Sequence, residues 1–172
     1  MNTNQKNLKP GDICLDYIPI DWPLTPLGIK KDPYTFGWQN KPFTAKEIKN
    51  EIEKGSCKAV GLLGGPVFNK PFGLVWIDVD GESVIDLVIE LSGVDPAEAL
   101  PCTLTIKSGK PGRERRLYKL SKDYWKHFTR NKYVWHTDVN HEQLEILWSK
   151  HQGALMGFHP ETDGYFTPEN GG

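Results

Sequence analysis

The sequence predicts an α/β (or α+β) fold, in which strands and helices alternate along a single domain. The clearest strand is the apolar run 72–79, which is hydrophobic enough to lie at the centre of a sheet. The clearest helix is 44–54, where Thr44 and Glu47 have the spacing of a capping box and Gly55 provides a stop. With 172 residues, of which 38% are hydrophobic, the chain can build one core of ordinary size.

The other elements follow from local patterns. Residues 17–43 are rich in proline and large aromatic rings and predict an ordered but irregular loop. Residues 84–91 have a helical period that ends at Ser92 and Gly93, and residues 121–130 predict a short helix. Shorter strands are expected at 59–63, 103–107, 113–120, 133–137, 143–148 and 154–158. The second and third of these should form a hairpin around the turn SGKPG, and the last should pair with the strand before it.

Hydropathy and cysteine usage exclude several classes of protein. No apolar run is long enough for a transmembrane helix or a signal peptide, so we expect a soluble, cytoplasmic protein without a membrane partner. Cys14, Cys57 and Cys102 are far apart and form no CxxC pair, so we expect reduced, structural cysteines. The tail after Phe166 carries no core-forming residue, from which we expect a domain, residues 1–172, excised from a longer protein.

Two aspartates close the buried strand in the stretch GLVWIDVDG. Residues i and i+2 of a strand point to the same side, so Asp78 and Asp80 project together. Such a pair repels itself unless a cation lies between, which predicts a site for Mg²⁺ or Mn²⁺, although a turn that caps the next helix has the same pattern. A two-metal site needs a further acid. Glu145, in the apolar strand QLEILW, is the first candidate and Asp138 the second, and Glu145 could instead be a half-exposed residue of an edge strand.

Basic residues are concentrated in one segment. The net charge is −1, yet ten Lys or Arg residues and only two acids lie between Lys107 and Lys132. This asymmetry predicts a basic face suited to phosphates, although a lysine-rich solvated surface has the same composition.

Within this segment the turn after Lys107 offers groups that bind phosphate. They are the hydroxyl of Ser108, the backbone N–H groups around Gly109, and the cations Lys107, Lys110, Arg113, Arg115 and Arg116. In a strand Arg116 lies on one face and Arg113 with Arg115 on the other, so only one set can face a given site. His159, after the last strand, could reach the same site or serve only in a turn.

In this order the motifs resemble the archaeo-eukaryotic primase superfamily, specifically its primase-polymerase (bifunctional DNA primase/polymerase, N-terminal) domain. GLVWIDVDG resembles the first motif of the family, TIKSGKPGRERRLYKL the second and QLEILW the third. The loop Lys30-Lys31-Asp32-Pro33, GLLGG and GFHPETDGY add to the likeness. The second motif departs from the family pattern, because Arg116 stands where a histidine usually precedes the aromatic residue by two positions.

The resemblance implies a mixed sheet like that of the RNA-recognition motif, joined to a smaller N-terminal α/β lobe. It further implies that Asp78, Asp80 and Glu145 are catalytic and bind two metal ions. Nucleotide binding is expected of one set of residues: Ser108, Gly109, Lys110, Arg113, Arg116 and His159. The implied activity is that of a DNA primase and DNA-directed polymerase that joins an NTP or dNTP to a 3′-hydroxyl on a single-stranded DNA template, with a fused or separate helicase or accessory domain as a partner.

Two other functions are compatible with the same residues. Acids on neighbouring strands also serve metal-dependent nucleases, but no lysine that could act as a general base stands beside the aspartate pair in the sequence. A nucleotide or single-strand binding module could retain the site without turnover. The distinction requires an assay in which chain growth, chain shortening and plain binding give different results.

Overall fold

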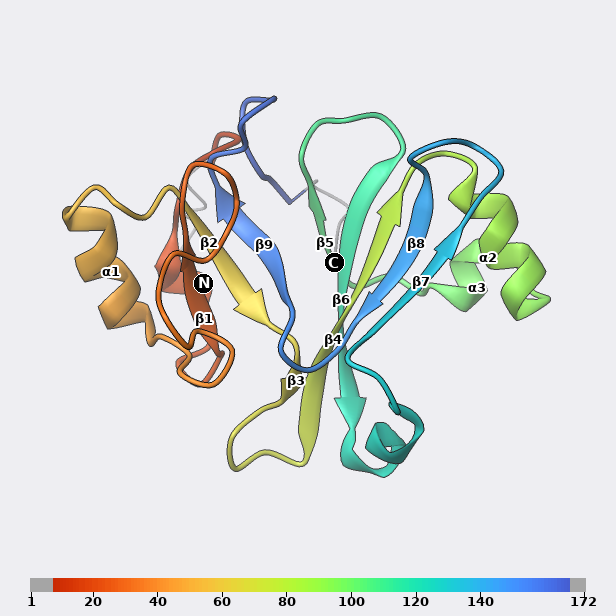
Figure 1. Cartoon of the computed structure of the whole chain (residues 1–172), viewed down its shortest axis with the longest axis horizontal. Coiled ribbons are helices and arrows are strands. Elements are labelled where there is room, and N and C mark those ends of the chain that lie inside the picture. The colour runs from red at the N-terminus through yellow and green to blue at the C-terminus, as the bar shows by residue number, and fades with distance from the viewer. Residues whose placement is uncertain (1–7, 168–172) are drawn as a thin grey trace, which may run out of the picture.

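Two antiparallel sheets make up the body of the molecule, which we describe from a computed structural model (Figure 1). The structure describes residues 8–167, so both ends of the domain expected over residues 1–172 lie outside the described residues. Helix α1 (Ala45–Glu53) lies beside the smaller sheet, and α2 (Val84–Ser92) and α3 (Pro96–Ala99) lie beside the larger one (Figure 1). The α+β class is confirmed.

The elements follow one another in the order η1, β1, α1, and then strands interrupted by short helices. Their bounds are η1 Leu15–Tyr17, β1 Leu24–Leu27, α1 Ala45–Glu53, β2 Ala59–Leu63, β3 Gly65–Pro66, β4 Phe72–Asp80, α2 Val84–Ser92, α3 Pro96–Ala99, β5 Leu104–Lys107, β6 Arg113–Ser121, η2 Lys122–His127, β7 Lys132–His136, β8 Gln143–Leu147 and β9 Gln152–Gly157. The η elements are 3-10 helices.

Strand β4 occupies the middle of the larger sheet, whose order is β5-β6-β4-β8-β7, with β3 paired to β4 beside this path. Its central position was predicted, and it follows from burial on both faces. Leu74 and Trp76 pack in the core between the two sheets, whereas Val75, Ile77 and Val79 pack in a second core with α2. All pairs in this sheet are antiparallel, so the expectation of mixed strand directions is wrong.

The smaller sheet has the order β1-β2-β9 and corrects two predictions. The loop expected over residues 17–43 contains β1, whose Pro26 hides the strand pattern but is tolerated because β1 is an edge strand. Strand β9 was expected to pair with β8 but pairs with β2. Both edges of β8 are already occupied, by β4 and β7, so the chain crosses to the other sheet. The smaller lobe is therefore completed by C-terminal residues.

The two sheets meet at Trp76. Its side chain is fully buried, and its indole N–H donates a hydrogen bond of 2.8 Å to the carbonyl oxygen of Leu62 on β2. Gly153 on β9 allows this approach, because a Cβ atom there would lie 2.5 Å from the indole ring. The end of β4 that carries the aspartates begins just beyond this contact, so its position relative to the smaller sheet is fixed.

The predicted helices are largely confirmed. Thr44 and Glu47 form both hydrogen bonds of the capping box at the start of α1. Helix α2 ends at Gly93, whose φ of 73° is left-handed. The helix expected over 121–130 is the shorter 3-10 helix η2, and α3 was not predicted. Within residues 8–167 no helix has the length and apolar character needed to cross a bilayer.

Candidate active site

A polar cleft of about 150 Å³ lies between the sheets, on the face of the larger sheet that looks toward the smaller one. The two sheets diverge from their contact near β3 toward the upper part of the view in Figure 1. Groups from both lobes line the cleft: Lys31, Asp78, Asp80, Ile106, Ser108, Lys110, Arg113, Glu114, Arg115, Ala154, His159 and Tyr165. The cleft thus brings together residues that are up to 134 positions apart, from Lys31 to Tyr165.

The three predicted carboxylates lie on one face of the larger sheet. Asp78 and Asp80 alternate with buried Val79 on β4, and Glu145 on β8 is the direct cross-strand partner of Asp78. Residues directly opposite each other in an antiparallel pair point to the same side of the sheet. Glu145 is buried, so the alternative of a half-exposed edge residue is wrong. Asp138 is exposed between β7 and β8 and does not line the cleft.

Each carboxylate has a cation beside it. Arg115 donates to Asp78, Arg113 lies 2.9 Å from Asp80, and Lys132 lies 2.6 Å from Glu145. Gln143 also donates to Glu145, at 2.6 Å. Across residues 8–167 no three side chains of the acid, His or Cys type are arranged as a ready-made metal site. A divalent ion that binds here must therefore compete with these cations.

The chemistry of the donor set nevertheless suits a hard cation. Burial raises the pKa of Asp80, and the neighbouring carboxylates of Asp78 and Glu145 raise it further, while Arg113 opposes this shift. The folded protein therefore disfavours the charged form of Asp80, a cost that a bound cation would relieve. Carboxylate oxygens of this kind are the ligands that Mg²⁺ and Mn²⁺ prefer, so the three acids fit the metal that the sequence predicts.

The basic turn between β5 and β6 contributes the second wall of the cleft. Ser108, Lys110 and Arg113 line the cleft, and Gly109 occupies the turn between them with a φ of 83°. Arg116 does not take part. It lies on the opposite face of the sheet, where it donates to Glu114 and to the carbonyl oxygen of Leu100.

The placement of Arg116 contradicts its predicted nucleotide-binding role, and the cause is the period of two in a strand. The register pairs Asp78 with Arg115 and Asp80 with Arg113, so these two arginines share the face of the aspartates. The alternation was visible in the sequence, but the family position of the histidine favoured the wrong set.

His159 and Lys31 lie together in one corner of the cleft, beside Lys110 and Ser108; we call it the anion-binding corner because its groups could bind an anion. His159 is buried, its Nε2 atom lies 3.4 Å from Nζ of Lys31, and its Nδ1 atom accepts a hydrogen bond from the backbone N–H of Glu161. Burial lowers the pKa of His159, and the charges of Lys31 and Lys110 lower it further. Burial likewise lowers the pKa of Lys31. A corner in which cationic forms are disfavoured gains stability when an anion enters.

Lys31 and Arg115 also line the cleft. Lys31 was not predicted as a site residue, whereas Arg115 was named among the cations of the basic turn but left out of the predicted nucleotide-binding set. Lys31 occupies a tight turn after β1 with a φ of 64°, and its N–H donates to the carbonyl oxygen of Gly28. The resemblance of the Lys30-Lys31-Asp32-Pro33 loop to the family was the available signal. Tyr165, whose burial raises its pKa to about 12, also lines the cleft. It ends the segment GFHPETDGY, whose likeness to the family was the available signal.

A second polar cavity of about 260 Å³ continues the cleft along β8. It shares Lys31, Arg115, Ala154 and Tyr165 with the first cavity and adds Lys132, Glu145, His151 and Gln152. Two buried atoms at its wall, Nε of Arg115 and Oε1 of Gln152, have no hydrogen-bond partner among the described residues. A buried donor and a buried acceptor without partners indicate that this part of the cleft accommodates a polar group.

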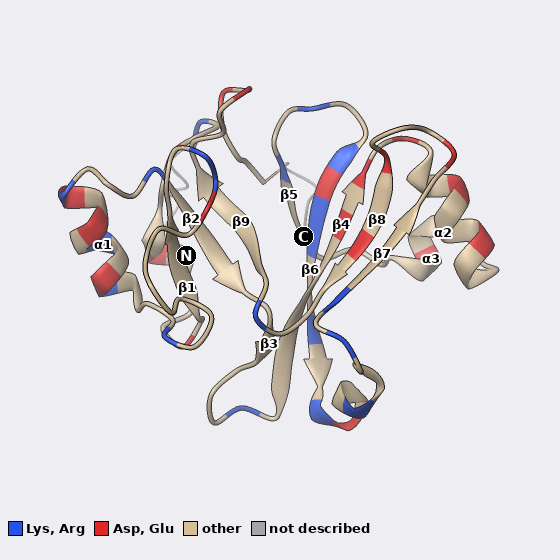
Figure 2. Cartoon of the chain, viewed as in Figure 1, with Lys and Arg blue, Asp and Glu red and all other residues tan. Residues whose placement is uncertain are grey.

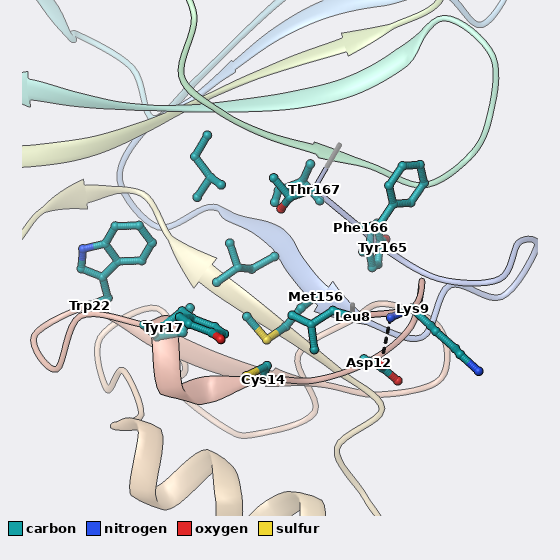
Figure 3. Close-up of a pocket in the computed structure, with 14 residues that line it drawn as sticks. Leu8, Lys9, Asp12, Cys14, Tyr17, Trp22, Met156, Tyr165, Phe166 and Thr167 are labelled. Carbon is teal, nitrogen blue, oxygen red and sulfur yellow. Dashed lines mark hydrogen bonds between the residues drawn. The ribbon is translucent and has the colours of Figure 1, made fainter. Parts of the chain in front are cut away.

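A third cavity, of about 250 Å³, is apolar (Figure 3). Leu8, Trp22 and Met156 point into it, while Lys9 and Asp12 meet at its rim in a hydrogen bond of 2.9 Å (Figure 3). It shares Ile106 and Tyr165 with the polar cleft. Its one carboxylate among the described lining residues, Asp12, accepts a hydrogen bond from the backbone N–H of Lys9, and no histidine or serine joins it, so we assign no catalytic role to this cavity.

The comparisons with known proteins agree with this geometry. Residues 14–164 match the family model described as "Bifunctional DNA primase/polymerase, N-terminal". No curated protein and no solved structure matches the chain. The matched range contains every residue of the polar cleft except Tyr165.

Proposed function

The chain belongs to the family of bifunctional DNA primase/polymerase N-terminal domains, and from this premise we propose that its polar cleft transfers nucleotides to a 3′-hydroxyl on a single-stranded DNA template. The supporting observation is the composition of one cleft. Asp78 and Asp80 lie on one wall, with Glu145 opposite Asp78 on the next strand in the adjoining polar cavity. Lys31, Ser108, Lys110, Arg113 and His159 surround the space beside the two aspartates. Carboxylates next to an anion-binding corner are what a nucleoside triphosphate and its cation require.

The anion-binding corner holds the triphosphate of the incoming NTP or dNTP in this proposal. Lys110 and Arg113 supply charge, the hydroxyl of Ser108 donates a hydrogen bond, and His159 closes the end near Lys31. When the 3′-oxygen forms its bond to the α-phosphorus, the bond between that phosphorus and the bridging oxygen breaks and pyrophosphate leaves. The cations of this corner stabilise the charge that develops on pyrophosphate.

Asp78, Asp80 and Glu145 would hold the metal ions. Bound Mg²⁺ or Mn²⁺ supplies activation of the 3′-hydroxyl and neutralisation of the triphosphate. Arg115 and Lys132, which contact Asp78 and Glu145, keep these carboxylates in place and can turn toward the phosphates of the substrate. The protein thus contributes position and charge.

A nuclease is the second candidate, and one contact favours it. The sequence shows no lysine beside the aspartate pair, but the fold brings Lys132 to within 2.6 Å of Glu145. A lysine next to a carboxylate can assist attack by water on a phosphodiester. The anion-binding corner argues for the polymerase, because hydrolysis of a strand does not need a site for a triphosphate.

A 5′-labelled primer annealed to a longer single-stranded template separates the candidates. With Mn²⁺ and the four nucleotides, a polymerase lengthens the primer, a nuclease shortens it and a binding module leaves it unchanged. We expect lengthening by the wild type and a loss of at least about 100-fold in Asp78→Asn. Asp86→Asn, an exposed acid of α2, is the matched control and should extend the primer like the wild type.

A further inference from the structure

The basic segment 107–132 separates into two parts that differ in how their charges are satisfied. The five cations from Lys107 to Arg116 each lie within ion-pair distance of a carboxylate: Lys107 and Arg116 of Glu114, Lys110 of Glu161, Arg113 of Asp80 and Arg115 of Asp78. The next four, Lys119, Lys122, Lys126 and Arg130, are exposed and form no ion pair within residues 8–167. The unpaired charge of the segment is therefore concentrated at the end of β6, on η2 and in the loop after η2, where Figure 2 shows it in blue.

Few acids offset this charge. Asp123 is the one acid between Lys119 and Arg130, and its carboxylate lies 3.4 Å from the hydroxyl of Ser121 at the start of η2. Asp21, whose pKa responds to Lys119, is engaged by Lys70 at 2.7 Å. Four cations against one acid leave a formal charge of about +3 on this surface, which attracts a polyanion.

Exposed aromatic rings accompany the cations. Tyr124 on η2 is 58% exposed, and Phe68 in the loop between β3 and β4 is 86% exposed. That loop is attached to η2, because the N–H of Lys122 donates a 3.0 Å hydrogen bond to the carbonyl oxygen of Pro71. Lys119 and Lys122 themselves lie over the rings of Phe72 and Trp125. Exposed rings next to cations without ion pairs are typical of surfaces that bind single-stranded nucleic acid, whose bases are accessible, rather than a duplex.

The surface also leads to the cleft. Arg130 precedes Lys132 by two residues, a backbone distance of at most about 7 Å. Lys132 opens β7 and reaches Glu145 inside the second polar cavity. A strand bound at Arg130 therefore lies next to the segment that borders the second polar cavity.

We propose that Lys119, Lys122, Lys126 and Arg130, with Tyr124 and Phe68, form a binding surface for single-stranded DNA outside the cleft. We call it the η2 surface. Its role in holding the template rests on the proposed function, but its binding of a single strand does not. The paired cations of the cleft, by contrast, serve the nucleotide.

The test is the affinity for a fluorescently labelled oligothymidine, measured by anisotropy at several salt concentrations without metal or nucleotide. Each phosphate contact contributes about 0.7 to the slope of log K against log salt, or about fivefold in affinity at roughly 0.1 M salt. The double variant Lys122→Gln/Lys126→Gln should lose about 25-fold in affinity and about 1.4 in slope. Lys46→Gln/Lys49→Gln, two exposed lysines of α1 without ion pairs, is the matched control and should bind like the wild type.

The aromatic part of the proposal has its own variant. Tyr124→Ala should weaken binding of the single strand by about fivefold or more and leave the salt slope unchanged, because stacking is not electrostatic. Thermal unfolding of each variant checks that the fold is intact. Affinity and slope that stay at wild-type values in the η2 variants, or that fall equally in the α1 control, would overturn the proposal.

The outcome is independent of catalysis. Single-strand binding that depends on η2, in a protein that extends no primer, supports the η2 surface and rejects the polymerase. Primer extension together with unchanged binding in the η2 variants supports the polymerase and rejects the η2 surface.

Discussion

Asp78 and Asp80 end a buried strand because cations next to them offset the cost of their charge. Arg115 contacts Asp78 and Arg113 contacts Asp80, and both arginines come from the adjacent strand β6. The compensation is incomplete at Asp80, whose pKa is raised by burial. At the scale of single residues, therefore, the charged form of Asp80 costs free energy in the folded protein, as expected of a cation-binding centre.

Removal of the charge of Asp80 tests this free-energy cost. Asp80→Asn should raise the stability of the metal-free protein by up to about 1 kcal/mol, or about 3 °C in melting temperature, because the folded state disfavours the carboxylate. The effect should be present near pH 7 and shrink as the pH falls through the raised pKa of Asp80. It should vanish below the ordinary pKa of 3.8, where Asp80 is neutral in both the folded and the unfolded state.

The same variant reports on metal binding. Mn²⁺ should raise the melting temperature of the wild type and of Asp86→Asn, but not that of Asp80→Asn, since an ion bound only to the folded state stabilises it. Equal stabilisation of all three proteins by Mn²⁺ would place the ion elsewhere.

His159 should make triphosphate binding pH-dependent. Its pKa is lowered from 6.5 by burial, Lys31 and Lys110, so its imidazole is neutral at pH 7. Protonation adds a positive charge next to the anion, so affinity for a non-hydrolysable nucleotide should rise as the pH falls below neutral, by at most about tenfold per pH unit. The difference between wild type and His159→Gln isolates this effect from protonation of the triphosphate. Parallel pH profiles of the two proteins would exclude a role for His159.

At this scale the sequence predicted which residue types belong to the site better than it predicted which face of the sheet each side chain lies on. Asp78, Asp80 and Glu145 were found because acids inside apolar strands are conspicuous. Arg115 and Arg116 are neighbours of the same type, and only the register of β6 against β4 decides which faces the acids. The turn that places Lys31 depends on a left-handed φ that composition does not reveal.

At the scale of elements, the contact between β9 and β4 positions the site. Gly153→Ala should destabilise the fold by about 1–3 kcal/mol, because its Cβ atom would lie 2.5 Å from the indole of Trp76 and 2.8 Å from Cδ of Arg115. Chemical denaturation measures the loss. Gly28→Ala, where the nearest atom is 3.6 Å away, is the matched control and should stay within about 0.5 kcal/mol of the wild type. Similar free energies of unfolding for the two variants would show that the two sheets can move apart to accommodate a Cβ atom at residue 153 without loss of stability.

Local signals predicted most elements, whereas pairing across the chain was harder to predict. The capping box at Thr44, the stop at Gly93 and the β5–β6 hairpin arise from neighbouring residues and were found. The pairing of β9 with β2 was missed, because it depends on which strand edges remain free after β4, β7 and β8 have assembled.

At the scale of the whole molecule, two sheets that meet at Trp76 and diverge beyond it create the cleft between them. The larger sheet contributes the carboxylates and the basic turn, and the smaller lobe contributes Lys31 and His159. The lobe that was expected to be N-terminal therefore consists of residues from both ends of the chain. No single segment of the sequence indicates this composition. In the proposed function, therefore, both lobes contribute to nucleotide binding.

The most direct test of the account is the incorporation of a single nucleotide. A primer annealed to a template with one defined unpaired base is incubated with Mn²⁺ and one nucleotide at a time, with wild type beside Asp78→Asn and Asp86→Asn. We predict addition of the complementary nucleotide by the wild type and by Asp86→Asn, and none by Asp78→Asn. Addition that ignores the template base, or that persists in Asp78→Asn, would contradict a templated polymerase built on these carboxylates.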